Sequence, residues 1–142
     1  MKRILALSTS VVAAAALATA GSAMQAKPRS GPLQVTKECS QYNGSAGSFC
    51  TITSSNIAAI KPGMRVVYAD PVRNGVLDSD LAVSRAHGPA AFGHVVLNLT
   101  TRTGRVTFSG GTGKFKTFRA DVAVSVDASG VIRWDGTYSF DR

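Results

Sequence analysis

Few residues of this 142-residue chain are of types that do chemistry, and their spacing excludes the common catalytic motifs. The only histidines are His87 and His94, and the only cysteines are Cys39 and Cys50. The chain has no nucleophile elbow, no zinc-protease motif and no paired-carboxylate motif. A zinc site built from Cys and His would need all four of these residues. We therefore expect neither a metal nor a cofactor.

The glycine-rich run from Gly110 to Lys114 (GGTGK) invites comparison with a phosphate-binding loop. The spacing G-x-x-x-x-G-K-[ST] is not met, and the residues that follow do not predict a helix. We interpret these glycines as permitting a tight turn with positive φ, or a bulge, between two strands.

The two histidines lie in different predicted surroundings. His87 lies in a Gly/Pro-rich loop, where we expect it to be solvated. His94 lies within a predicted strand, where it is either a structural residue or a proton donor or acceptor in a pocket.

The N-terminus has the layout of a secretory signal peptide. Lys2 and Arg3 precede an uncharged run rich in Ala, Val and Leu, and small residues follow at cleavage spacing. We predict a signal peptide over residues 1–23, with cleavage between 20 and 26; the alternative is a membrane anchor. The mature protein is then secreted, extracellular or periplasmic, and no later stretch is long and apolar enough to span a membrane.

Export favours a disulfide between Cys39 and Cys50, which flank a turn-rich segment. The alternative is a pair of reduced, buried thiols.

The chain is basic, with 16 Lys and Arg against 8 Asp and Glu. Six of the basic residues lie between Leu81 and Ala120, a stretch that contains no acid. A basic face attracts anionic ligands, cell-wall polymers or nucleic acid. Because no RNA-binding aromatic motif is interleaved with these charges, we expect a solvated rim and no nucleic-acid partner.

The elements that must position these residues are strands. From Phe118 to Val126 apolar and polar residues alternate, and the same alternation returns from Val131 to Phe140 after the turn Asp127–Gly130. This pattern predicts an antiparallel hairpin. Further short strands are predicted over Phe49–Ser54, Gly63–Ala69, Val76–Arg85, Ala91–Thr100 and Gly104–Ser109. We therefore expect an all-β domain over residues 35–142, preceded by a disordered lead over residues 24–34.

The strand from Ala91 to Leu99 is apolar on both of its faces. It is either covered by a neighbour on its outer side or carries a few tolerated surface apolar residues.

The segments Phe92-Gly93-His94 and Phe108–Phe115 (FSGGTGKF) resemble the allene oxide cyclase and dirigent barrel superfamily. The resemblance covers roughly residues 60–140. It implies a closed eight-stranded antiparallel barrel of the calycin or allene-oxide-cyclase type, with a central cavity and often with assembly into trimers. Allene oxide cyclases use a buried N-terminal glutamate, whereas Glu38, the only Glu here, adjoins a cysteine rather than a family motif.

Dirigent proteins use aspartates in the pocket. By strand parity, Asp78, Asp80 and Asp135 fall opposite the apolar faces that we expect to point inward. The catalytic residues of these families are therefore not transferred to this chain.

The leading hypothesis is an exported barrel that binds a small hydrophobic molecule in its lumen, and in doing so steers a cofactor-free cyclisation or coupling. The predicted ligand-binding residues are Tyr68, His94, Phe118, Val122, Trp134 and Tyr138. One alternative is an exported structural or interaction domain whose barrel is filled by side chains. Another is a basic adhesion module that attaches to an anionic polymer.

Overall fold

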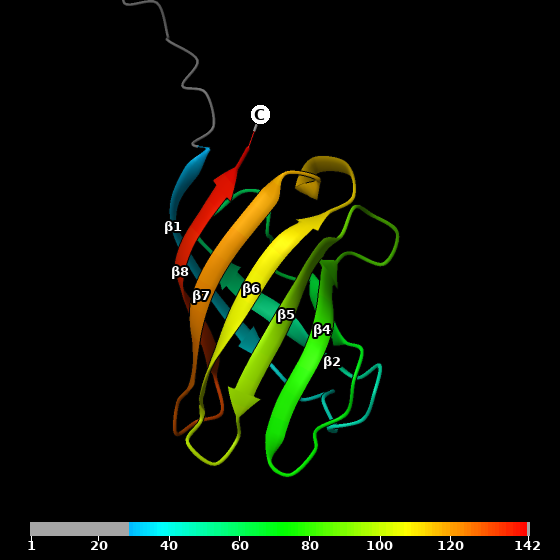
Figure 1. Cartoon of the computed structure of the whole chain (residues 1–142), viewed down its shortest axis with the longest axis vertical. Coiled ribbons are helices and arrows are strands. Elements are labelled where there is room, and N and C mark those ends of the chain that lie inside the picture. The colour runs from blue at the N-terminus through cyan, green and yellow to red at the C-terminus, as the bar shows by residue number, and fades with distance from the viewer. Residues whose placement is uncertain (1–28, 142) are drawn as a thin grey trace, which may run out of the picture.

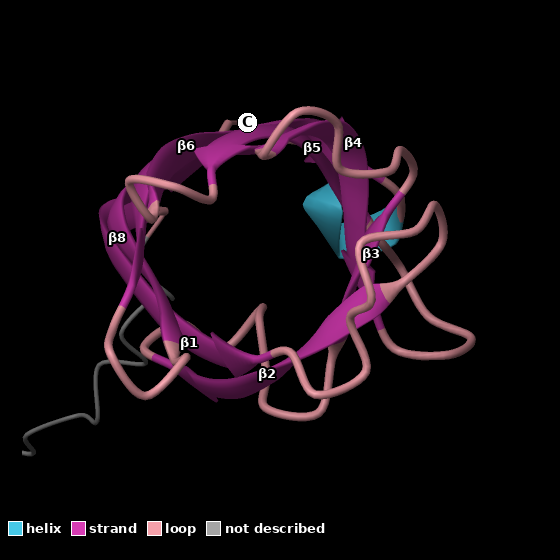
Figure 2. Ribbon diagram, turned by 90° about the horizontal axis from the view of Figure 1, so that it is seen from below, coloured by secondary structure: helices cyan, strands magenta, loops and turns pink. Residues whose placement is uncertain are grey.

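The computed structural model describes residues 29–141 and shows a closed barrel of eight antiparallel strands. Each strand pairs with the next in sequence, and the last pairs back with the first, so the strands form the complete ring seen in Figure 2. The strands are β1 (Ser30–Glu38), β2 (Phe49–Ser55), β3 (Arg65–Tyr68), β4 (Val76–Ser84), β5 (Ala91–Asn98), β6 (Thr103–Gly111), β7 (Phe118–Val126) and β8 (Ile132–Phe140). The prediction of an all-β, closed, eight-stranded antiparallel barrel is confirmed.

The strands form where polar and apolar residues alternate, because alternation gives each strand one inward and one outward face. Burial alternates along β7 and β5 with a period of two. In β8, Trp134 and Tyr138 face inward, as the parity of the sequence predicts.

The barrel begins earlier than predicted. β1 starts at Ser30, so residues 30–34 belong to the barrel and not to a disordered lead. The sequence was misleading here because it contains Pro32, which cannot donate to a strand ladder. Pro32 pairs with β8 on one side, while its carbonyl oxygen on the other side accepts a hydrogen bond from the Asn56 side chain. Its missing N–H therefore faces a side where no strand is paired. The predicted signal peptide and residues 24–28 lie outside the described residues.

Side chains fill the interior of the barrel. The inward-facing residues of all eight strands form one core, in which most side chains have an exposed fraction between 0% and 8%. Aromatic rings meet within it, since the ring centroids of Phe108 and Trp134 are 5.5 Å apart and those of Phe108 and Phe118 are 5.4 Å apart.

The glycine-rich run makes the connection between β6 and β7. It ends in a single 3-10 turn, η1 (Gly113–Phe115), whose Phe115 is fully buried. Gly113 has φ +54, as expected for a turn glycine. Gly111 is required for a different reason, because a Cβ there would lie 2.0 Å from the carbonyl oxygen of Ala90. The run is thus a structural turn packed against the preceding loop.

The two ends of the barrel differ. β1 begins and β8 ends at one end, which we call the mouth; Figure 1 shows the C-terminus beside the start of β1 there. β1 ends at the opposite end, where a disulfide links Cys39 to Cys50. The predicted disulfide is confirmed. Residues 29–141 contain no helix long and apolar enough to span a membrane.

Candidate functional site

The mouth carries a pocket of about 440 Å³, which we call the mouth pocket. Four segments far apart in the sequence form it: the start of β1, the loop after β2, the 3-10 turn and the end of β8. Its lining residues are Arg29, Asn56, Ile57, Ala58, Ala59, Lys61, Lys114, Tyr138 and Phe140.

The loop after β2 forms one wall, and hydrogen bonds fix it to β1. The Asn56 side chain accepts from the backbone N–H of Gln34 (2.7 Å) and donates to the carbonyl of Pro32 (2.9 Å). The backbone N–H of Asn56 also donates to the Gln34 carbonyl (3.1 Å). At the far end of the wall Ile60 is fully buried and anchors the loop in the core. The wall is therefore preorganised.

The floor of the pocket is aromatic. Phe140 packs against Phe118 with ring centroids 5.1 Å apart, and against Tyr138 at 5.9 Å. Phe118 also contacts Phe115 at 5.6 Å. Because these rings hold one another in place, the pocket has a rigid apolar base beside the barrel core.

The rim of the pocket is cationic. Arg29, Lys61 and Lys114 are all exposed and come from three different segments. Among residues 29–141, no Asp or Glu lines the pocket. Asp141 follows Phe140 and is exposed, but it does not line the pocket.

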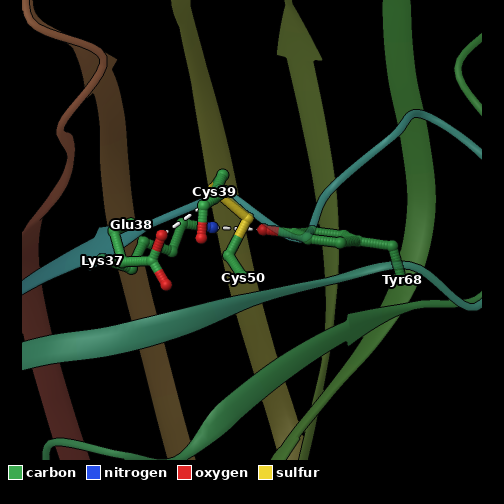
Figure 3. Close-up of a disulfide and its surroundings, with 6 residues drawn as sticks. Lys37, Glu38, Cys39, Cys50 and Tyr68 are labelled. Carbon is green, nitrogen blue, oxygen red and sulfur yellow. Dashed lines mark hydrogen bonds between the residues drawn. A yellow bond between two sulfur atoms is a disulfide. The ribbon is translucent and has the colours of Figure 1, made fainter.

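The opposite end of the barrel buries a lysine. Lys37 is 2% exposed, and its amine donates a hydrogen bond to the Tyr68 hydroxyl; Figure 3 shows this contact beside the disulfide. The Lys37 Nζ also lies 4.6 Å from the centroid of the Trp134 ring. Burial lowers the pKa of Lys37 to about 7 and raises the pKa of Tyr68 above its usual value.

The disulfide-closed loop between β1 and β2 covers this end. The backbone N–H of Gly47 donates to the carbonyl of Tyr68 (2.7 Å), and the N–H of Tyr68 donates to Ser48 (3.1 Å). The Tyr42 ring packs edge-on against Tyr68 at 5.2 Å. Because the loop seals Lys37 from solvent, its amine is a structural element of the core and is not accessible to a ligand in this conformation.

His94 lies on the outer wall. Its Nδ1 is 2.8 Å from a carboxylate oxygen of Asp80, and its Nε2 is 2.6 Å from one of Asp78. Hydrogen bonds to Asp80 and Asp78 raise the pKa of His94 above its ordinary value. On the same outer face of β5, Phe92 is 46% exposed and Val96 is 47% exposed. On this face, two exposed apolar side chains therefore flank the ion-paired His94.

The structure does not bring the six predicted ligand-binding residues to one place. Tyr138 lines the mouth pocket, and Phe118 packs beneath it with ring centroids 6.5 Å apart. Val122 and Trp134 lie in the filled interior. Tyr68 lies at the disulfide end against Lys37. His94 faces outward and shares no site with the other five. As predicted, Asp78 and Asp80 also face outward.

Two features of these sites were missed from the sequence. Lys37 has the same parity as the buried Leu33 and Val35, but no strand was predicted over these residues, so its inward orientation was missed. The rim cations Arg29 and Lys61 have no local signal, because only closure of the barrel brings them together. Among the described residues, no cluster of His, Cys, Asp and Glu has the arrangement of a metal site.

Comparison with protein-family models, curated proteins and solved structures finds no match for this chain.

Proposed function

We propose that this protein is an exported barrel that binds a small hydrophobic molecule in the mouth pocket. One observation carries the proposal: a preorganised hollow of about 440 Å³ with an aromatic floor lies at one end of an otherwise filled barrel. That volume falls within the range of ordinary small-molecule sites, which are mostly apolar with a few polar groups. We propose the mouth as the binding site, and not the barrel axis, because side chains occupy the axis.

The chemistry of the pocket favours binding over acid–base catalysis. The described residues that line it include Lys and Tyr but no carboxylate, imidazole or thiol, the groups that most often serve as general base or nucleophile. A cyclisation or coupling at this site would depend on holding one conformation of the ligand against the rigid floor. A reaction of this kind therefore requires that the pocket bind a ligand.

Export is supported by two independent features. The sequence begins with a signal-peptide pattern, and the only two cysteines are joined in a disulfide. Disulfides form and persist in oxidising compartments such as the periplasm and the extracellular space.

A second function is favoured by a different observation. The three large apolar residues that are most exposed on the described surface, Phe92, Val96 and Leu99, all lie on β5 or immediately after it. Exposed apolar side chains gathered along one strand favour contact with another protein. In this case the barrel is a structural or interaction domain, and self-association, as in the trimers of the resembling families, is one way to cover β5.

Blocking the pocket separates the two functions. Ala58 is an exposed residue of the pocket wall, so Ala58→Trp should fill the hollow without entering the core. Ala123→Trp adds the same bulk on the outer face of β7, away from the pocket, and serves as the control.

We expect calorimetric titration with a panel of small apolar compounds to show binding to the wild type and to Ala123→Trp. Binding should be lost in Ala58→Trp, with an unchanged circular dichroism spectrum. Equal binding by all three proteins, or binding by none, would refute the mouth pocket as the site and leave the interaction domain as the better account.

A further inference from the structure

We propose that the mouth pocket selects an anionic amphiphile: a molecule with one negatively charged group attached to an apolar body. This inference rests on the proposed function and names the class of ligand that the same pocket takes. It follows from the placement of the charges around the aromatic floor.

The charges of the rim are of one sign and converge from separate segments. Arg29 precedes β1, Lys61 follows β2, and Lys114 lies in the 3-10 turn, so they are remote in sequence but line one hollow. All three side chains are exposed at its edge. Cations that share a concave, partly apolar surface reinforce one another's potential and attract an anion to it.

Two cations of the outer wall are paired with carboxylates. On the wall, Arg105 is paired with Asp121, and Arg133 lies 3.8 Å from Asp127. Within residues 29–141, neither Arg29 nor Lys61 forms an ion pair. Arg65 and Arg119 of the wall also form none, so the rim is distinguished by having several cations that line one hollow. An anionic group of a ligand would give Arg29 and Lys61 a counter-charge.

The apolar floor and wall of the pocket would contact the apolar part of the ligand. Phe140 and Tyr138 present ring surface, and Ile57 and Ala59 supply aliphatic surface from the wall. A ligand that is only charged would leave this surface in water, and one that is only apolar would give Arg29 and Lys61 no counter-charge. The anionic group can be a carboxylate or a phosphate, because ammonium and guanidinium groups bind both.

Four decyl compounds test the inference, each used below its micelle-forming concentration with the mature, disulfide-intact protein. They are decanoate, decyl phosphate, decanol and decyltrimethylammonium, which share one apolar chain and differ in the head group. We expect decanoate or decyl phosphate to bind at least about tenfold more tightly than decanol, a difference of about 1.4 kcal/mol. The comparison of the two anions identifies the preferred head group. We expect decyltrimethylammonium to bind more weakly than decanol.

A matched pair of variants ties the preference to the rim. Lys61→Met keeps the length of the side chain and removes its charge, whereas Lys116→Met makes the same change at an exposed lysine outside the pocket. Lys61→Met should weaken anion binding several-fold without changing decanol binding, and Lys116→Met should change neither. Added salt should weaken anion binding and spare decanol.

The outcomes that oppose the inference are distinct from those that oppose the proposed function. Equal affinity for decanol and decanoate would overturn the anionic class and leave a hydrophobic site at the mouth. Anion binding that Lys61→Met leaves unchanged would overturn the role of the rim. Failure of all four compounds to bind would overturn the inference and the proposed function together.

Discussion

The buried amine of Lys37 should make the stability of the barrel rise with pH, and Lys37→Met should abolish that rise. Lys37 is 2% exposed, and no carboxylate within residues 29–141 pairs with it; its amine contacts the Tyr68 hydroxyl and the Trp134 and Tyr68 rings. Its pKa is lowered from 10.5 to about 7 by burial. The unfolded chain therefore binds a proton more tightly than the native barrel does, and stability increases with pH between these two values.

The size of the effect follows from the two pKa values. At pH 7 the difference in proton affinity costs the native state about 4 kcal/mol, since each pKa unit is worth ~1.4 kcal/mol. At pH 9 the cost has fallen to about 2 kcal/mol, and it vanishes above the unfolded value. The wild type should gain about 2 kcal/mol between pH 7 and pH 9 from this one group.

Lys37→Met replaces the amine by an apolar side chain of similar length. The variant leaves the Tyr68 hydroxyl without its partner, which costs roughly 1–3 kcal/mol, so the net gain at pH 7 is smaller than the ionisation term alone. The pH dependence of the difference between variant and wild type is not affected by this constant term.

Urea unfolding followed by the fluorescence of the single Trp, with the disulfide intact, measures the difference directly. The free energy of unfolding of Lys37→Met, taken relative to that of the wild type, should fall by about 2 kcal/mol from pH 7 to pH 9. Subtracting the two curves cancels His94, whose partners Asp78 and Asp80 are the same in both proteins. A difference in unfolding free energy that stays constant over this pH range would refute the lowered pKa of the buried Lys37 amine.

Three further changes test the packing and electrostatics. Gly111→Val should lower stability by more than about 3 kcal/mol in thermal unfolding, because its Cβ would lie 2.0 Å from a carbonyl oxygen. Lys114→Ala should lower stability by less than about 0.5 kcal/mol. Similar melting temperatures for the two variants would contradict this. NMR titration should place the pKa of His94 above 6.5. Its ionisation then stabilises the barrel fully below the pKa of the unfolded chain, and this stabilisation is lost as pH rises through the pKa of the folded protein. A value at or below 6.5 would contradict the two carboxylate contacts. Replacing Cys39 and Cys50 by Ala should lower stability by about 3 kcal/mol for this short loop, and intact mass after alkylation should detect no free thiol in the wild type.

The strands were predictable because their signal is local. Alternation along β7 and β8 sets which side chains enter the barrel, and the structure follows that parity at Trp134 and Tyr138. The same reasoning left β5 undecided, because both of its faces are apolar, and so the position of His94 was not fixed by pattern alone.

The mouth pocket was not predictable from the sequence, because its walls come together only when the barrel closes. Tyr138 was expected to meet a ligand, but its partners in the pocket, Arg29 and Lys61, stand in irregular segments with no periodic signal. Pro32 concealed the first half of β1, and with it the parity that places Lys37 in the core. A proline on the unpaired side of a strand does not interrupt the strand, but sequence alone does not show which side is unpaired.

The most direct test of ligand binding at the mouth is a map of backbone amide chemical shifts during titration with decanoate. The largest changes should fall on residues 56–61 and on Phe140, which surround the mouth pocket. The amides of Lys37 and Tyr68, at the disulfide end, should barely move. Changes concentrated on those two residues would place the ligand inside the barrel, and a spectrum unchanged at saturating decanoate would contradict binding at the mouth.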